Sequence, residues 1–192
     1  KAFDEATAIL AGDELISLAF EILADEATHK TVTTRLDLVA GLARASGMQG
    51  MVGGQMIDMM AARDTLDAGG LTRLQKMKTG ALISFAVDAG AILGDAEASE
   101  RNALSGFAHD IGLAYQIADD VLDLEGDADI LGKSVGKDDA QDKSTFVSLL
   151  GVERAREQAL QLSHQAVSYL DAFGERAEPL REAAAFVIQR RS

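Results

Sequence analysis

The chain has 192 residues, 47% of them hydrophobic, and a formal net charge of −13. This charge excludes binding to nucleic acid through bulk electrostatics, because no basic stripe exists to displace the counterions of a polyanion. Cysteine is absent, which excludes disulfides and thiolate zinc sites and fits a reducing compartment. No apolar run is long enough to cross a bilayer, so we expect no stable membrane insertion and a cytoplasmic location.

Helical patterns extend along the whole chain. Aromatic residues make up only 5% and there is a single proline, a composition that favours helices over sheets. Gly69-Gly70 should break the pattern, as should Gly174 and Pro179, and the Gly- and Asp-rich segment 125–144 is predicted to be a loop. The spacing of apolar residues predicts helices over 3–24, 35–64, 72–93, 98–124, 145–173 and 179–190, the first three largely buried. We therefore expect one all-α domain over residues 1–192.

Two motif-like stretches near residue 130 fail on inspection. The sequence GDADILGKS resembles a phosphate loop, but five residues separate Gly126 from Gly132 where four are needed, and a helix precedes it instead of a strand. Counted as a calcium loop from Asp123, it places Ala128 where Gly is required and Ser134 where the bidentate Glu belongs. Neither a phosphate loop nor a calcium loop is predicted.

Other glycines and the histidines give no ligand site either. The glycines of GMQGMVGGQ (47–55) follow no strand, which excludes a dinucleotide fingerprint and predicts close contact between helices instead. The three histidines lack a helical His or Glu partner at metal-ligand spacing, so each is predicted to be an ordinary surface or core residue. They are His29, His109 and His164.

The stretch YQIADDVLD (115–123) carries several polar side chains on one side of a predicted helix. At about 100° per residue, Gln116, Asp119, Asp120 and Asp123 fall within roughly a quarter of the circumference. Apolar residues take the other directions. Two carboxylates about 4 Å apart repel by about 4 kcal/mol at an effective dielectric near 20, so a cation or a proton must compensate. A divalent ion is predicted; a solvated face with chance spacing is the alternative.

The chemistry of that ion points to phosphate. All-oxygen ligands select hard cations, and Mg²⁺ commonly binds one or two carboxylates and completes its shell with substrate phosphates. Lys78 lies among apolar residues of a predicted helix, and Lys133 and Lys143 lie in the loop after the acidic helix. These three lysines are candidates to clamp a polyphosphate.

Several stretches together resemble a known family. YQIADDVLD resembles the second aspartate-rich DDxxD motif of the trans-isoprenyl diphosphate synthases, the polyprenyl synthetase family. GGQMID, KTGAL, GKSVGKDDAQDKSTF and the final VIQRR are similar to further elements of the family, in the same order. The resemblance covers essentially all 192 residues and is strongest to the bacterial farnesyl diphosphate synthases.

The resemblance implies a helical bundle of the isoprenoid synthase type around a central active-site cavity. It also implies condensation of isopentenyl diphosphate with an allylic diphosphate (dimethylallyl or geranyl) to farnesyl diphosphate, with Mg²⁺ as cofactor, Mn²⁺ as a substitute, and a homodimer. In the family, a first DDxxD motif and an Arg pair precede the segment that corresponds to KAFDEATAILAGD. We therefore expect the 192 residues to be the C-terminal two thirds of a longer chain, and to be inactive alone.

The resemblance also implies roles for individual residues. Asp119 would coordinate the metal directly, with Asp120 and Asp123 in the same shell. Thr79 and Gln116 would place lone pairs near a developing carbocation. The allylic diphosphate would be bound by Lys78 and Lys133, with Lys143 beside them.

Two further pairs have open roles. Gln55 and Asp58 share a helix face and would support the wall of the site; a structural hydrogen bond is the alternative. Arg190 and Arg191 would close over the second diphosphate; an exposed basic tail is the alternative.

Other functions stay open at this point. A geranyl or geranylgeranyl diphosphate synthase differs only in product length, which the family sets with side chains upstream of its first aspartate motif. A terpene cyclase shares the fold and Mg²⁺ but usually lacks the second DDxxD motif and the lysine loop. A non-catalytic subunit would keep the bundle, and a plain helical interaction module would leave the spacing of the Lys and Asp residues unexplained.

Overall fold

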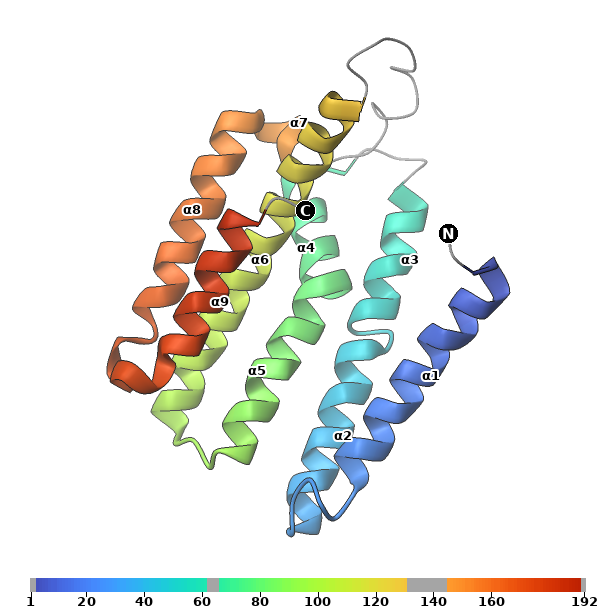
Figure 1. Cartoon of the computed structure of the whole chain (residues 1–192), viewed down its shortest axis with the longest axis vertical. Coiled ribbons are helices and arrows are strands. Elements are labelled where there is room, and N and C mark those ends of the chain that lie inside the picture. Colours follow the sequence, from blue (N-terminus) through green and yellow to red (C-terminus); the bar gives the residue numbers. More distant parts are fainter. Residues whose placement is uncertain (1–2, 62–65, 131–144, 191–192) are drawn as a thin grey trace.

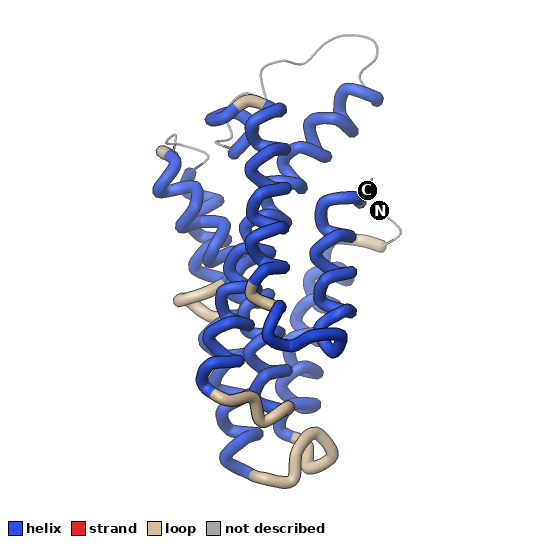
Figure 2. Tube along the Cα trace, turned by 90° about the vertical axis from the view of Figure 1, so that its left-hand side faces the viewer, coloured by secondary structure: helices blue, strands red, loops and turns tan. Residues whose placement is uncertain are grey.

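The structure, a computed structural model, describes residues 3–61, 66–130 and 145–190, with the backbone alone for 126–130. Long helices run roughly side by side along the long axis of the molecule (Figure 1). The described part of the chain contains no strand (Figure 2), which confirms the all-α prediction. None of the described helices is both long and apolar enough to cross a bilayer.

The described residues form a series of helices. Two short segments depart from α-helical geometry: η1 is a π-helix and η2 is a 3₁₀-helix. In chain order the elements are α1 (Glu5–Ala24), α2 (Val32–Ser46), α3 (Met51–Ala61), α4 (Ala68–Gln75), η1 (Lys76–Gly80), α5 (Ala81–Leu93), α6 (Ala98–Ile130), α7 (Phe146–Leu150), α8 (Val152–Ser168), η2 (Asp171–Ala177) and α9 (Glu178–Gln189).

Helix α6 is the central element of the bundle. It packs against α5, η1, α7, α8 and α9. One apolar cluster lies along its first half, where Phe107 and Ile111 meet Leu170 and the buried alanines of α8 and α9. A second cluster lies along its second half, where Ile117 and Val121 meet residues of α4, α7 and α8. Burial of these faces fixes the direction of every other α6 side chain.

Local signals set several helix ends. The Asp4 carboxylate caps α1 by accepting the Thr7 N–H at 2.9 Å. Thr145 and Ser148 form a capping box at the start of α7. Pro179 lies in the first turn of α9, where its missing N–H costs nothing.

Two helices that were predicted to be continuous, over 35–64 and 145–173, are interrupted in the structure, so their predicted continuity was wrong. Gly47 has extended backbone geometry and ends α2, and α3 begins at Met51. Gly151 has φ +81°, a conformation that favours glycine, and separates α7 from α8. The predicted separation by Gly174 and Pro179 is confirmed, because Gly174 (φ +58°) lies between α8 and α9.

Two other boundaries also differ from prediction. Gly69-Gly70 does not break a helix: the doublet lies in the first turn of α4, where the Asp67 carboxylate accepts the Gly70 N–H at 2.7 Å. Helix α6 continues through Ile130, so residues 125–130 of the predicted loop are helical.

The expectation that the first three helices are largely buried was wrong for α1. This helix packs along α2 and contains no buried residue. Large apolar side chains of α1 are exposed, among them Ile9, Leu10, Leu15 and Ile22. Periodic apolar residues give a helix but do not say whether a neighbour covers its face.

The predicted close contact of the GMQGMVGGQ glycines is confirmed at Gly54. A Cβ at this buried position would lie 2.3 Å from the backbone nitrogen of Lys78 and 2.6 Å from its Cα. Helix α3 therefore touches the main chain of η1, and only glycine permits this approach. The contact sets the distance between α3 and the segment that carries Lys78.

We predict that Gly54→Ala lowers the free energy of unfolding by about 1–3 kcal/mol, because α3 and η1 must separate to admit a methyl group. Gly90→Ala is the matched control: position 90 is also inside a helix but has nothing within 4 Å of an added Cβ. That control should raise stability by about 0.5–1 kcal/mol. Denaturant titration measures both, and an equal effect of the two substitutions would contradict the close contact.

Candidate active site

The carboxylate face predicted on residues 115–123 lies on the second half of α6. Asp119 and Asp120 are half-buried and Asp123 is exposed, whereas Ile117 and Val121 are buried in the second apolar cluster behind them. The predicted split between an acidic side and an apolar side is therefore present, although Leu124 is exposed instead of packed.

Asp119 is paired with Arg190 at the end of α9. The Arg190 Nη2 donates to Asp119 Oδ1 at 2.6 Å, and the guanidinium lies 4.0 Å from the centre of the Tyr115 ring. The Arg190 side chain is only 10% exposed, so it is not a free basic tail. Arg191 lies outside the described residues.

Asp120 binds the start of α7. Its Oδ2 accepts the Phe146 N–H at 2.8 Å. Burial, against the lowering effect of the Phe146 hydrogen bond and with a smaller contribution from the Asp119 and Asp123 carboxylates, raises the pKa of Asp120 to about 6. This carboxyl is thus the member of the trio that most needs a nearby positive charge.

Lys78 and Thr79 lie in η1. The Lys78 Nζ donates to Asp58 Oδ2 at 2.7 Å, and both side chains are partly buried. Asp58 is therefore the ion-pair partner of the lysine, a role in which it holds the ammonium group in place. Gln55, one turn earlier on α3, is exposed. Single-turn π segments inside α-helices occur frequently at functional sites.

Helix α6 contacts the main chain of η1 just before its acidic half. A Cβ at Gly112 would lie 3.6 Å from the Gly80 Cα. Gln116, one turn after Gly112, is 7% exposed. The segment with Lys78 and the helix with the carboxylates are therefore adjacent and lie toward the same end of the bundle (Figure 1). Lys133 and Lys143, the other two predicted lysines, lie outside the described residues.

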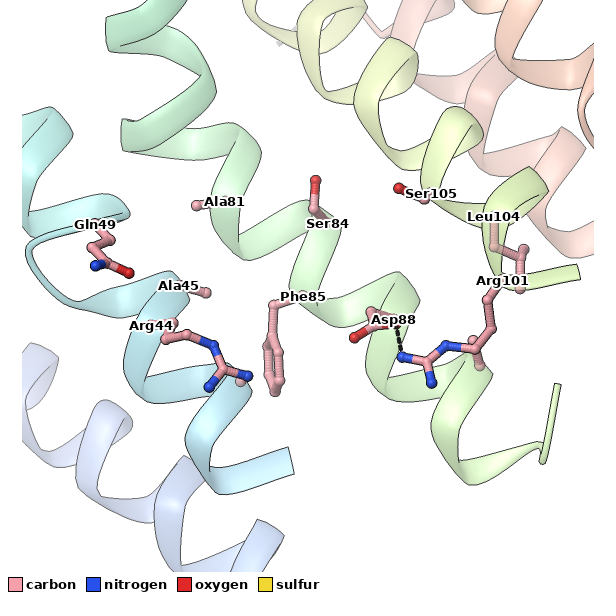
Figure 3. Close-up of a pocket in the computed structure, with 12 residues that line it drawn as sticks. Arg44, Ala45, Gln49, Ala81, Ser84, Phe85, Asp88, Arg101, Leu104 and Ser105 are labelled. Carbon is pink, nitrogen blue, oxygen red and sulfur yellow. Dashed lines mark hydrogen bonds and ion pairs between the residues drawn. The ribbon is translucent and has the colours of Figure 1, made fainter. Parts of the chain in front are cut away.

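A cleft of about 480 Å³ lies between α2, α5 and the start of α6. Phe85 projects from α5 toward α2, with Arg44 beside it (Figure 3). The ring rests on Gly41, where a Cβ would lie 2.9 Å from a ring carbon. On α6 the cleft is bordered by Ser105 and by Arg101, whose Nη2 donates to Asp88 Oδ1 at 2.8 Å.

The cleft lies on the helix faces that carry the predicted site residues. On α6, steps of four, three and four residues lead from Ser105 to Gln116, which keeps the two on one face. On α5, Ala81, Phe85 and Asp88 follow the same i, i+4, i+7 spacing directly after η1. The cleft thus lies farther along the same helix faces, after Lys78 on the chain in α5 and before the carboxylates in α6.

Sequence reasoning missed the Arg190 contact and the cleft. Arg190 and Asp119 are 71 residues apart, and no local pattern connects them. The cleft residues Arg44, Phe85 and Arg101 belong to no motif. The one available signal for the cleft was the pair of small residues Gly41 and Ala45, spaced i, i+4 on α2.

The donor set fits a hard divalent cation. All three carboxylates offer oxygen ligands, and Asp119 already binds one cation, the Arg190 guanidinium. Within the described ranges, no three acidic or histidine side chains converge on one point. One or two carboxylates would therefore hold Mg²⁺, which commonly completes its shell with water and phosphate oxygens.

We predict that Asp120→Asn stabilises the metal-free protein at pH 7.5. Between pH 3.8 and about 6 the folded state binds more protons than the unfolded state, so stability falls as the pH rises, and the full penalty is present above pH 6. The shift corresponds to about 3 kcal/mol, which partial exposure reduces to about 1 kcal/mol.

Denaturant titration at pH 4 and pH 7.5 measures this effect, which should appear only at the higher pH. The asparagine oxygen can still accept the Phe146 N–H. Asp123→Asn is the matched control, because Asp123 is exposed and its neutralisation should change stability little. A less stable Asp120→Asn variant at pH 7.5 would contradict the assigned pKa.

Comparison with known proteins gives consistent matches. The family model described as Polyprenyl synthetase matches residues 1–177. Farnesyl diphosphate synthase from Bacillus subtilis (strain 168) is 43% identical over 81% of this chain and 53% of its own length. The chain thus spans about half the length of that curated relative.

Solved structures of similar proteins share the fold. An apo FPP/GFPP synthase from Zymomonas mobilis is 48% identical, with a TM-score of 0.83 over 97% of this chain and 62% of that one. A geranyltransferase from Helicobacter pylori, complexed with magnesium and isoprenyl diphosphate, is 32% identical, with a TM-score of 0.75 over 97% of this chain and 60% of that one. The all-α bundle is therefore of the isoprenoid synthase type, and the chain belongs to the polyprenyl synthetase family.

Proposed function

We propose that the chain forms the diphosphate-binding part of a Mg²⁺-dependent prenyltransferase that condenses isopentenyl diphosphate with dimethylallyl or geranyl diphosphate to farnesyl diphosphate. The observation that carries the proposal is the packing of η1, with Lys78, against α6 at Gly112, one turn before Gln116, on helices that also line a cleft. Cationic and acidic groups on helix faces that continue into a cleft suit a ligand with a diphosphate head and an apolar tail.

In this proposal the protein contributes mainly electrostatics and shape. Asp119 would hold Mg²⁺ directly, with Asp120 and Asp123 in the same shell, and the ion would draw charge from the leaving diphosphate. Lys78, positioned by Asp58, binds the allylic diphosphate directly. Thr79 and Gln116 direct uncharged oxygen atoms toward the developing carbocation without quenching it. Walls that exclude water protect that cation from hydrolysis.

The relatives support the metal and the class of substrate in this proposal. Mg²⁺ and an isoprenyl diphosphate occur together in the Helicobacter pylori geranyltransferase. Mn²⁺ as a substitute, binding by Lys133 and Lys143, a support role for Gln55 and a cytoplasmic location remain predictions. A homodimer is also part of the proposal, supported by the exposed apolar side chains of α1 and α2, such as Leu15, Ile22 and Leu36.

We predict that Asp119→Ala lowers turnover by two or more orders of magnitude while circular dichroism still reports the native helix content. The assay measures labelled prenyl product formed by the whole natural polypeptide that contains these residues, with Mg²⁺ and both diphosphates. Asp37→Ala, at an exposed position of α2, is the matched control and should keep normal turnover.

The same assay separates the alternatives. Product formed without isopentenyl diphosphate would indicate a terpene cyclase, and absence of product with both substrates would indicate a non-catalytic subunit. Chelation of divalent ions should abolish turnover. Near-normal turnover of Asp119→Ala would remove that residue from the metal site.

Product length depends in this proposal on Phe85, whose ring lies across the cleft. Removing the ring should deepen the cleft, so Phe85→Ala should shift the products of the whole polypeptide by at least one isoprene unit toward longer chains. Phe186→Ala removes the same ring from an exposed position of α9 and should leave the products unchanged. Chromatography of the products measures the shift; unchanged or shorter products from Phe85→Ala would place the growing chain elsewhere.

A further inference from the structure

Arg190 is an unusually enclosed cation for a residue at the end of a helix. Its side chain is 10% exposed, whereas the Asp119 side chain that it contacts is 45% exposed. Solvent, and any ion dissolved in it, therefore reaches the carboxylate more easily than the guanidinium. The aromatic ring of Tyr115 lies against the guanidinium.

The Arg190 guanidinium makes few hydrogen bonds in this position. Its one hydrogen bond given by the structure goes to Asp119, and the buried Nε has no hydrogen-bond partner among the described residues. Arg181 on the same helix makes a useful comparison, because it donates to the Leu170 and Gly174 carbonyls and to Glu178. A buried donor without a partner has given up water without compensation. Arg190 would recover that hydration by leaving Asp119.

We infer that Arg190 is a resident counter-ion of Asp119 that exchanges with Mg²⁺, so that metal binding disconnects the end of α9 from α6. This inference rests on the proposed function, because it requires Asp119 to be a metal ligand. A guanidinium and a divalent cation at one carboxylate repel each other, and the carboxylate gains more from the ion of higher charge. The two cations therefore compete for Asp119.

The exchange is confined to the end of α9. Val187 and Ile188, the residues before it, pack against the apolar clusters and hold the helix in place. Arg190 has extended backbone geometry and follows the last helical residue. Release of its side chain therefore alters the contacts of Tyr115 and Asp119 without unfolding α9.

Tyr115 supplies a direct readout. Residues 1–192 contain two tyrosines and no tryptophan, so in a polypeptide of these residues Tyr169→Phe leaves Tyr115 as the single tyrosine. In this background, Mg²⁺ alone is titrated at constant ionic strength, and tyrosine near-ultraviolet circular dichroism and calorimetric heat are recorded in parallel. We expect the tyrosine signal to change with the same midpoint as the heat.

Arg190→Gln should bind Mg²⁺ about 3- to 10-fold more tightly, and its tyrosine signal should no longer respond to the ion. Arg156→Gln is the matched control. It also removes one positive charge, from an arginine of α8 that pairs with Glu125 on α6. Mg²⁺ affinity should stay within twofold of the parent in this control.

The outcomes separate the inference from the proposed function. Absence of Mg²⁺ binding by the parent, even with inorganic pyrophosphate present, would overturn both. Binding by the parent with equal or weaker affinity in Arg190→Gln would overturn the exchange alone, and weaker affinity would show that Arg190 orients the carboxylate for the metal. A tyrosine signal that ignores saturating Mg²⁺ would also overturn the exchange.

Discussion

Three carboxylates within two turns of a helix whose other side is buried create a local excess of negative charge that the rest of the bundle must accommodate. The structure does so in a different way at each residue. Asp119 accepts a hydrogen bond from the Arg190 guanidinium, Asp120 accepts one from a backbone N–H, and Asp123 is exposed to solvent. The first two contacts each bring another element to α6: the end of α9 at Asp119 and the start of α7 at Asp120. The acidic face is therefore also a structural junction.

Backbone contacts at glycine place the positive side of the site. Gly54 lets α3 touch the main chain at Lys78, and α6 at Gly112 lies in van der Waals contact with Gly80. Because both contacts involve main-chain atoms, the distance of η1 from its neighbours does not depend on side-chain rotamers. The Lys78 ammonium is then fixed by Asp58. Electrostatic stabilisation of a reaction is most effective when the charged groups are held in place before the ligand arrives, and this arrangement provides that condition.

The sequence was sufficient for the helices and the acidic face because both depend on local periodicity. Asp119 and Asp120 share a face by geometry alone, and the backbone preferences of Gly174 and Pro179 suit the break between α8 and α9 and the first turn of α9. The sequence was insufficient where a contact joins distant segments. Three contacts depend on how the helices pack: the ion pair of Arg190 with Asp119, the hydrogen bond from Phe146 to Asp120, and the contact of the Phe85 ring with Gly41. The exposure of α1 also escaped prediction, since an apolar stripe has the same pattern whether or not a neighbour covers it.

The π-helical segment η1 affects how the protein can evolve by deletion of a single residue. A π turn contains one residue more than the α-helical turn it replaces, so it rotates the helix before it by about 100° relative to the helix after it. Lys78 sits within that insertion, and the cleft wall formed by α5 begins directly after it. Loss of a single codon in this segment would turn α4 and α5 relative to each other without altering a catalytic side chain. In the proposed function, a single deletion would therefore change the orientation of the surface that binds the diphosphate relative to the surface that binds the apolar tail.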